Sequence, residues 1–183
     1  MMGRIGMVWG LLGVIVLVTQ PIVRLTPLVV EAVEGGLSVL QWVVMILWVL
    51  VNAHAEGYRG FHRRFSPRVV ARAQVLAANP RPAWVVFAPL FCMSLFHASR
   101  RGVWTARILV VSIVTLVLAV RQLPQPWRGI VDAGVVVGLA IGLSSIVLFI
   151  GRMLAGHPPT VPPDLPPDLP PDQAPDQAGG RSG

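Results

Sequence analysis

The stretch Ile5–Val23, IGMVWGLLGVIVLVTQPIV, holds nineteen residues and no charged side chain. A helix of that length crosses a hydrocarbon core of about 30 Å, because each residue adds about 1.5 Å along the axis. A cleaved signal peptide is the alternative, since Arg4 precedes the apolar run. The run is longer than the roughly 7–15 apolar residues of a signal peptide, and no small-x-small cleavage site follows it. The sequence therefore predicts an uncleaved transmembrane helix.

Three further segments have spanning length, and the composition of the chain agrees with them. Of 183 residues, 54% are hydrophobic and 13% are charged, and the mean hydropathy is +0.68. A soluble core of this size does not bury so much apolar surface, so we expect lipid to cover part of it. Pro21 and Pro27 predict a short break, which places Glu31 and Glu34 in the first turns of the second helix. The predicted spans are about 5–23, 34–53, 103–121 and 130–150.

A shorter apolar segment, about 83–97, contains Pro89 and falls below spanning length. It is either a re-entrant or interfacial segment or a short, kinked span. If it returns to its own side, twelve of the fifteen basic residues, all arginine, lie on one side of the membrane; if it crosses, nine do. The positive-inside rule favours the first arrangement. The predicted fold is an all-α membrane protein with four transmembrane helices, one short re-entrant or interfacial segment and both termini in the cytoplasm.

The connection after the second predicted span is rich in arginine. We expect residues 54–65 to form an arginine-rich cytoplasmic loop, with Glu56, Arg63 and Arg64 as candidate functional residues. Ser66-Pro67 and Asn79-Pro80 are typical helix boundaries and predict an amphipathic cytoplasmic helix at 67–78, lying in the headgroup plane. Anionic lipid headgroups are the predicted partner. A phosphorylated or acidic ligand and a docked protein are the alternatives, and nucleic acid is not expected.

Asp132 is the acidic residue of the last predicted span, and Arg128 precedes it by four residues. At that spacing the two side chains can pair along one face of a helix. Because an ionisable residue inside a membrane is a functional candidate by default, two hypotheses stand. The pair is either a structural anchor near the interface or part of a pathway that moves a proton or an ion.

Gly134, Gly138 and Gly142 repeat at intervals of four along the same span. Such a row lets another helix approach closely, as in GxxxG packing. The row is predicted to be a packing face within the bundle or between subunits of a homo-oligomer. A weaker row in the first span, Gly6, Gly10 and Gly13, makes the first and last helices candidate partners.

The composition changes abruptly at the C-terminal end. From Val161 to Asp176 a four-residue pattern ending in Asp occurs four times, with proline in every copy. Dense proline prevents helix formation and regular Asp adds self-repulsion. We expect a polytopic helical bundle at 1–157 and a disordered Pro/Asp-rich tail at 158–183.

Residue patterns for catalysis or cofactor binding do not stand out. Cys92 has no partner at ligand spacing, and the four histidines form no metal-binding motif, so we expect no metal and no cofactor. An enzyme would have to use His54, Glu56 or His62, which makes that class the least favoured. The leading hypothesis is a non-enzymatic accessory or scaffold protein of an inner (cytoplasmic) membrane; the alternative is a transporter or channel subunit acting as an oligomer. The absence of lysine and the abundance of Ala, Gly, Pro and Arg indicate a GC-rich bacterial genome.

Overall fold

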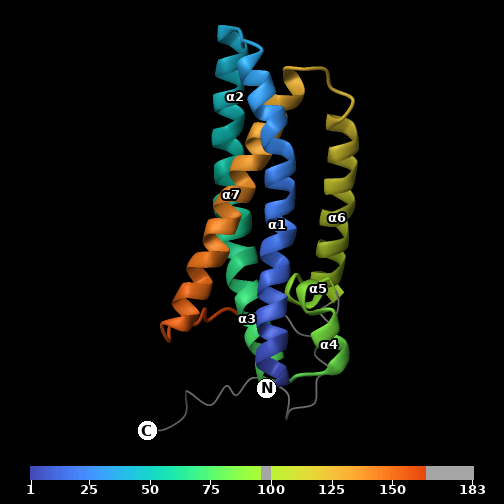
Figure 1. Ribbon diagram of the computed structural model, residues 1–183, viewed down its shortest axis with the longest axis vertical. Helices are drawn as coiled ribbons and strands as arrows, with labels where there is room; N and C mark the ends of the chain where they lie inside the picture. Colours follow the sequence, from blue (N-terminus) through green and yellow to red (C-terminus); the bar gives the residue numbers. More distant parts are fainter. Residues whose placement is uncertain (96–99, 164–183) are drawn as a thin grey trace.

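The computed structural model describes residues 1–95 and 100–163, apart from some side chains within 100–113, and its regular secondary structure is entirely helical there. Four long segments run along one axis, and two short helices lie near the end that holds the N-terminus (Figure 1). In chain order the elements are α1 (Met2–Glu34), α2 (Val39–Asn52), η1 (Ala53–Phe65), α3 (Ser66–Ala78), α4 (Pro82–Val86), α5 (Ala88–Cys92), α6 (Arg100–Val120) and α7 (Trp127–Leu154).

The first helix is longer than predicted. Helix α1 continues through Pro21 and Pro27, so the break expected between these prolines is wrong. Thr19 and Thr26 donate their hydroxyl protons to carbonyl groups one turn earlier, at 2.8 and 2.7 Å. Membrane helices tolerate proline when hydroxyl side chains and neighbouring helices compensate for the missing backbone bond. Glu34 therefore ends α1, and the predicted second span does not begin there.

The turn between α1 and α2 has clear local causes. Gly35 caps α1, and Gly36 adopts a φ of 82°, a left-handed conformation that glycine adopts without a Cβ clash. Ser38 then forms a capping box with Gln41: the Ser38 hydroxyl accepts the Gln41 backbone N–H, and the Gln41 side chain accepts the Ser38 N–H. The second long helix consequently starts at Val39.

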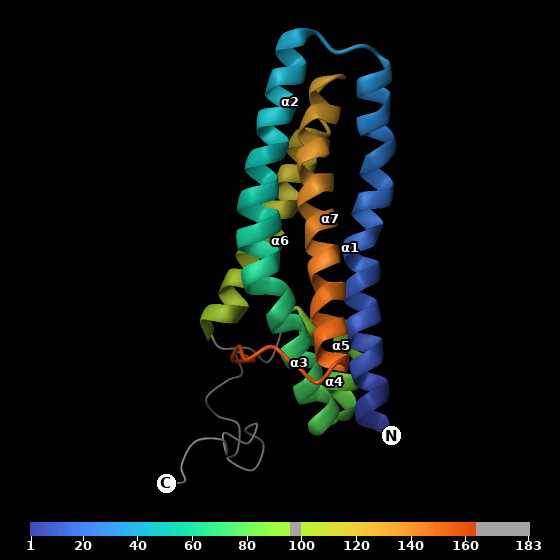
Figure 2. The ribbon, with the colours of Figure 1, turned by 90° about the vertical axis from the view of Figure 1, so that its left-hand side faces the viewer.

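The prediction of an arginine-rich loop at 54–65 is wrong, because these residues are helical. They form η1, a π-helical segment that joins α2 to α3 in one continuous helix, Val39–Ala78. Figure 2 shows this helix running beside α7 over most of its length. Forty residues of helix measure about 60 Å, which is twice the thickness of a hydrocarbon core. The helix cannot lie within the hydrocarbon along its whole length.

The short apolar segment predicted at 83–97 forms two helices of five residues each over its described part. Helix α4 ends at Val86, and Pro89 sits in the first turn of α5. Both helices pack against the N-terminal half of α1, and α5 also contacts α3. Neither is long enough to span a membrane. Residues 96 and 97 of this segment, and residues 164–183 of the predicted tail, lie outside the described residues.

Within the described residues, three helices are long and apolar enough to cross a membrane: Met2–Glu34, Val39–Ala78 and Trp127–Leu154. The chain is therefore a helical membrane protein. Helix α6 covers the remaining predicted span, 103–121, almost completely. The predicted boundaries of the spans in lipid stay predictions.

The packed core lies at the end of the bundle that holds the N-terminus. It brings together α1, α3, α5 and part of α7 around Val14, Val70, Leu76, Phe91 and Ile146, all of them 0% exposed. At the opposite end most side chains of α2 are exposed, and Asn52 is the only buried residue of that helix. Exposed apolar side chains also extend along α1 as far as Ile5.

Candidate functional site

The glycine row of α7 receives the long helix Val39–Ala78. A Cβ atom added at Gly134 would lie 2.6 Å from Trp48 Nε1, and one at Gly142 would lie 2.5 Å from the Phe61 ring. Gly138 faces Glu56 and has more room, since its added Cβ would lie 3.5 Å from the nearest atoms. The absence of side chains at these positions allows close approach of the two helices.

The two glycine rows do not face each other. Helices α1 and α7 pack together extensively. Gly6 and Gly10, however, face Leu76 of α3 and Cys92 of α5, and Gly13 lies against Pro89. The predicted pairing of the first and last helices is therefore confirmed, but the glycine rows serve other contacts: the row of α1 accommodates α3, α4 and α5, and the row of α7 accommodates α2 and η1.

Polar contacts accompany the glycine row across the same interface. The Trp48 indole N–H donates to the Val131 carbonyl at 3.1 Å, near the start of α7. Further along, His62 Nδ1 lies 3.0 Å from the Ser145 hydroxyl. Because each of these bonds joins helices distant in sequence, they fix the axial register of η1 against α7.

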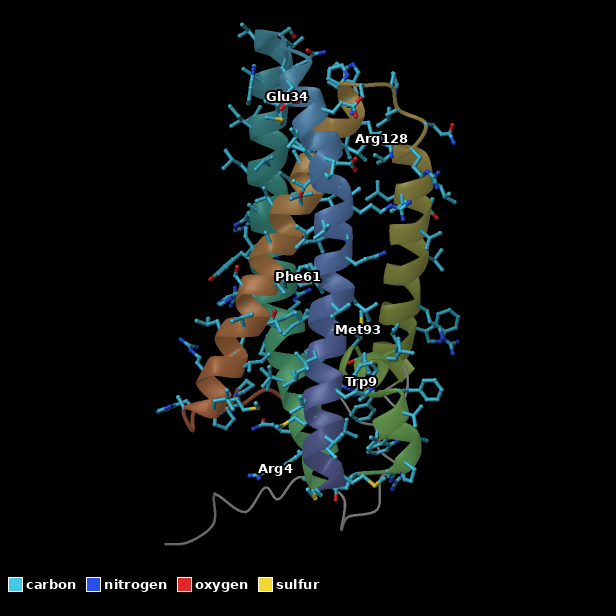
Figure 3. All side chains as sticks on the ribbon, viewed as in Figure 1. Arg4, Trp9, Glu34, Phe61, Met93 and Arg128 are labelled. Atoms are coloured by element: carbon cyan, nitrogen blue, oxygen red, sulfur yellow. The ribbon has the colours of Figure 1, made fainter. Side chains whose placement is uncertain are left out.

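Arg128 and Asp132 lie at the start of α7, as their spacing predicts. The Arg128 Nε and Asp132 Oδ2 atoms are 3.9 Å apart, and the Asp132 side chain is 6% exposed. Within the described residues neither atom has a hydrogen-bond partner. Figure 3 places Arg128 near the same end as Glu34, far from Arg4. The pair is a loose contact, not a bidentate ion pair.

Arg72 contradicts the prediction of an interfacial amphipathic helix. The helix predicted at 67–78 exists as α3, but nine of its thirteen residues are buried, Arg72 among them. The Arg72 Nε donates to the Phe91 carbonyl at 2.6 Å, and its guanidinium lies 4.2 Å from the centre of the Phe91 ring. The Arg72 Nη1 donates to the Pro163 carbonyl at 2.9 Å. Arg72 thus joins α3 to α5 and to the segment after α7.

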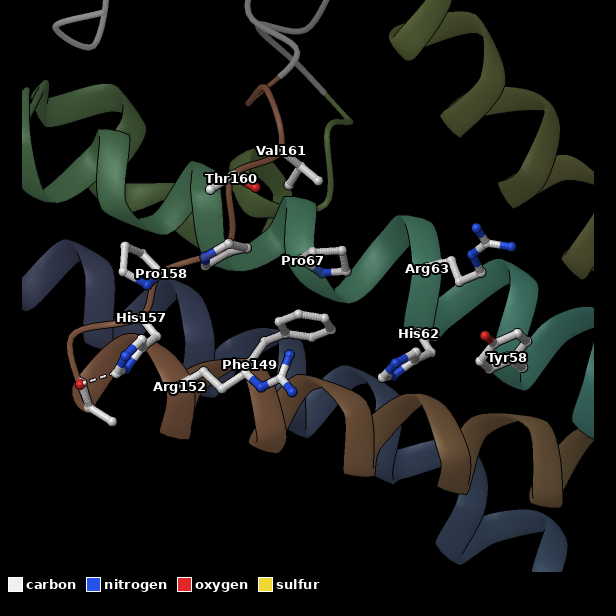
Figure 4. Close-up of a pocket in the computed structure, with 12 residues that line it drawn as sticks. Tyr58, His62, Arg63, Pro67, Phe149, Arg152, His157, Pro158, Thr160 and Val161 are labelled. Atoms are coloured by element: carbon white, nitrogen blue, oxygen red, sulfur yellow. Dashed lines mark hydrogen bonds between the residues drawn. The ribbon is translucent and has the colours of Figure 1, made fainter. Parts of the chain in front are cut away.

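A hollow of about 750 Å³ opens between η1, the end of α7 and the segment 155–161 (Figure 4). We call it the basic hollow. Its polar lining consists of Tyr58, His62 and Arg63 from η1, Arg152 from α7, and His157 and Thr160 after α7. None of the lining residues, which all belong to the described part of the chain, is acidic.

Stacked aromatic rings form one wall of the basic hollow. The rings of Tyr58 and His62 are stacked with centroids 5.7 Å apart, and the His62 and Phe149 rings are 5.5 Å apart. The Arg152 guanidinium lies 5.8 Å from the centre of the Phe149 ring. These contacts, together with the His62–Ser145 hydrogen bond, hold Tyr58 and His62 in place between the two helices.

The candidate residues from the sequence do not form one site. Glu56 lies beside Gly138, Arg63 lines the basic hollow, and the Arg128–Asp132 pair is near the other end of α7. Arg64 is exposed and is not part of the lining. Sequence reasoning missed Tyr58, His62, Arg152 and His157 as one group. The spacing of four in His54, Tyr58 and His62 indicates a shared helix face, but only for a helix, and a loop was predicted there.

Known proteins and metal chemistry add no further assignment. Comparison of the chain with protein-family models, curated proteins and solved structures finds no match. Among the residues that the structure describes, no three His, Cys, Asp or Glu side chains are grouped so as to hold a metal ion.

Proposed function

We propose that this protein is a small multi-pass protein of a bacterial inner membrane that acts as a non-enzymatic accessory or scaffold component. The observation that carries the proposal is the exposure of apolar side chains on α2. Its apolar side chains, including Leu47 and Val51 at 58% each, point away from the bundle. A helix that contributes so little to its own core offers its surface to lipid or to the helix of a partner.

The proposed topology has four spans, with α6 as the third and the α4–α5 segment re-entrant on the cytoplasmic side. Support comes from the arrangement of the charges. The start of α1 and the end of α7 lie at the same end of the bundle (Figure 1). Arg4 lies at this end, and Arg68 and Arg152 belong to α3 and to the last turn of α7 (Figure 3). Glu34 and Arg128 lie at the other end. Positive charge on the cytoplasmic side is the arrangement that the positive-inside rule favours.

Photo-crosslinking from α2 tests the accessory function. A photoreactive amino acid is placed at Leu47 or Val51 and, as a control, at Arg64, which is exposed but lies in the polar η1 segment. In native membranes we expect a stoichiometric crosslink from α2 to one polypeptide of a different sequence, and none from Arg64. Crosslinks only to lipid from both α2 positions would contradict the accessory function. Crosslinks only to a second copy of the chain would favour the alternative described next.

A transporter or channel subunit is the alternative, and one observation favours it. Asp132 is 5% exposed in a predicted span, and its Oδ2 has no hydrogen-bond partner among the described residues. Buried carboxyl groups in membrane helices commonly mark proton or ion pathways. If the protein conducts, Asp132→Asn in proteoliposomes abolishes proton or cation flux while Asp176→Asn, in the tail, leaves it unchanged. Absence of flux through the unmodified protein removes this alternative.

A further inference from the structure

We propose that the basic hollow binds a phosphate group, with Arg63 and Arg152 as the charged contacts. The proposal concerns a ligand and does not depend on whether the protein acts as a scaffold or a transporter. It rests on three observations: basic side chains surround one hollow, none of the described lining residues is acidic, and the stacked rings of Tyr58 and His62 hold one wall in place.

The two arginines reach the hollow from different elements. Arg63 comes from η1 and Arg152 from the last turn of α7. Figure 4 draws the Arg63 guanidinium directed away from α7, so this exposed side chain would turn toward Arg152 when a ligand binds. Guanidinium groups present several N–H donors in a fixed plane and match the oxygens of a phosphate. Both arginine side chains are exposed, so a ligand can reach them without first breaking a buried contact of either guanidinium group.

Hydroxyl groups and imidazole rings complete the polar lining. The Tyr58 hydroxyl, the Thr160 hydroxyl and the rings of His62 and His157 also line the hollow. His62 is already held by Ser145 and by its ring contacts with Tyr58 and Phe149. A site whose donors are held in place loses less conformational entropy when a ligand binds.

An exposed apolar side chain neighbours Arg152 on α7. Leu148 precedes Arg152 by four residues, so the two share a helix face, and Leu148 is 45% exposed. A phospholipid would place its phosphate in the hollow and its acyl chains along this stretch of α7. Free phosphate would use the polar lining of the hollow without the apolar stretch. Both sources share the phosphate chemistry, and the experiment below separates them.

Calorimetric titration of the full chain in maltoside detergent tests the site. The probes are a short-chain phosphatidylglycerol, a phosphatidylcholine with the same chains, and inorganic phosphate. We expect saturable binding of phosphatidylglycerol that weakens at least about tenfold in Arg63→Gln/Arg152→Gln, since charge-assisted hydrogen bonds are lost. The matched control is Arg24→Gln/Arg121→Gln, which removes the same charge from exposed positions outside the hollow and should leave binding unchanged.

Each outcome has one meaning. Binding of phosphatidylglycerol without binding of inorganic phosphate assigns the site to a lipid headgroup, and binding of both assigns it to the phosphate itself. Equal loss in the two arginine variants, or equal binding of phosphatidylglycerol and phosphatidylcholine that neither variant weakens, would overturn the proposal. A circular dichroism spectrum like that of the unmodified protein shows that each variant is folded, and because the four arginines are exposed we expect all to pass.

Discussion

Helices α2 and α3 are two ends of one continuous helix, yet burial and polarity are inverted between them. The α2 end, VLQWVVMILWVLVN, is almost entirely apolar and buries only an asparagine. The α3 end, SPRVVARAQVLAA, carries two arginines and a serine and buries nine of thirteen residues. In water this arrangement would be unstable, because the most apolar surface would be the most exposed. The inversion is stable only if lipid or the helix of a partner covers the exposed side of α2 while the protein itself surrounds α3.

The comparison also explains the role of η1. It carries Glu56, Arg59, Arg63 and Arg64 as exposed residues between the two ends. These charges lie directly below the apolar side chains of α2, and they avoid hydrocarbon only where water, a headgroup or another polar group meets them. The basic hollow is part of this polar segment.

The largest expected difference between the two ends concerns packing. Leu76 is 0% exposed and Leu47 is 58% exposed. We expect Leu76→Ala to lower the free energy of unfolding by about 2–5 kcal/mol through loss of buried methyl groups and formation of a cavity. Leu47→Ala, the matched control, should change it by less than about 0.5 kcal/mol. Unfolding by SDS in mixed micelles measures both, and equal losses would mean that α2 is packed against protein.

A charge placed in α2 tests whether this helix, unlike η1, lies in the membrane. Leu47→Arg should raise the apparent free energy of insertion of this helix by about 3 kcal/mol, because arginine near the centre of a span is unfavourable. Tyr58→Arg, one segment further along in η1, should have no measurable effect. Glycosylation-mapping assays of insertion report both values. Normal insertion of Leu47→Arg would show that this residue does not lie in hydrocarbon.

Substitutions in the glycine row of α7 should change the free energy of unfolding by a smaller amount. Gly142→Ala should lower the free energy of unfolding by about 1–3 kcal/mol, since the new methyl group overpacks against Phe61. Gly138→Ala is the matched control and should be nearly neutral, because its Cβ would meet Glu56 at an ordinary 3.5 Å. The same SDS titration compares the two variants. A larger loss for Gly138→Ala would contradict the register of η1 against α7.

Asp132→Asn should have the smallest effect on stability. The Arg128–Asp132 contact is long, at 3.9 Å, and Arg128 is 30% exposed, so it can reach solvent without its partner. We expect a change of less than about 1 kcal/mol in either direction. A loss of several kcal/mol in the SDS titration would mean that the pair anchors the start of α7.

Composition was enough to predict an all-helical membrane protein, and Asn79-Pro80 located the end of α3 at Ala78. The predicted helix start at Ser66-Pro67 is wrong, because Ser66 lies inside the continuous helix Val39–Ala78 and makes no capping hydrogen bond. Local signals for the α1–α2 turn were also present: Gly35-Gly36 is followed by the capping box of Ser38 and Gln41. They were outweighed by Pro21 and Pro27, which break helices in water but are accommodated within α1.

Axial register could not be predicted from the sequence. The apolar runs are offset from one another along the bundle axis. Gly3 contacts Ala77, whereas Gly129 near the other end contacts Leu28. Ile5–Val23 therefore lies beside α3, α4 and α5, and the later part of α1 approaches the start of α7. Such offsets depend on which side chain packs against each small residue, as Cys92 does against Gly10. The periodicity of one helix does not show which neighbouring helix will pack there.

The central claim, that α2 faces the hydrocarbon when no partner is bound, is tested most directly by spin labels on single cysteines of the purified protein, reconstituted alone in bilayers. Burial raises the pKa of the native Cys92 thiol to about 12, although Arg72 lowers it, so this residue should stay unlabelled near neutral pH. At Leu47→Cys we predict strong collisions with oxygen and weak collisions with a water-soluble nickel complex, and at Arg64→Cys the reverse. Ready access of the nickel complex to the label at Leu47→Cys would contradict the account.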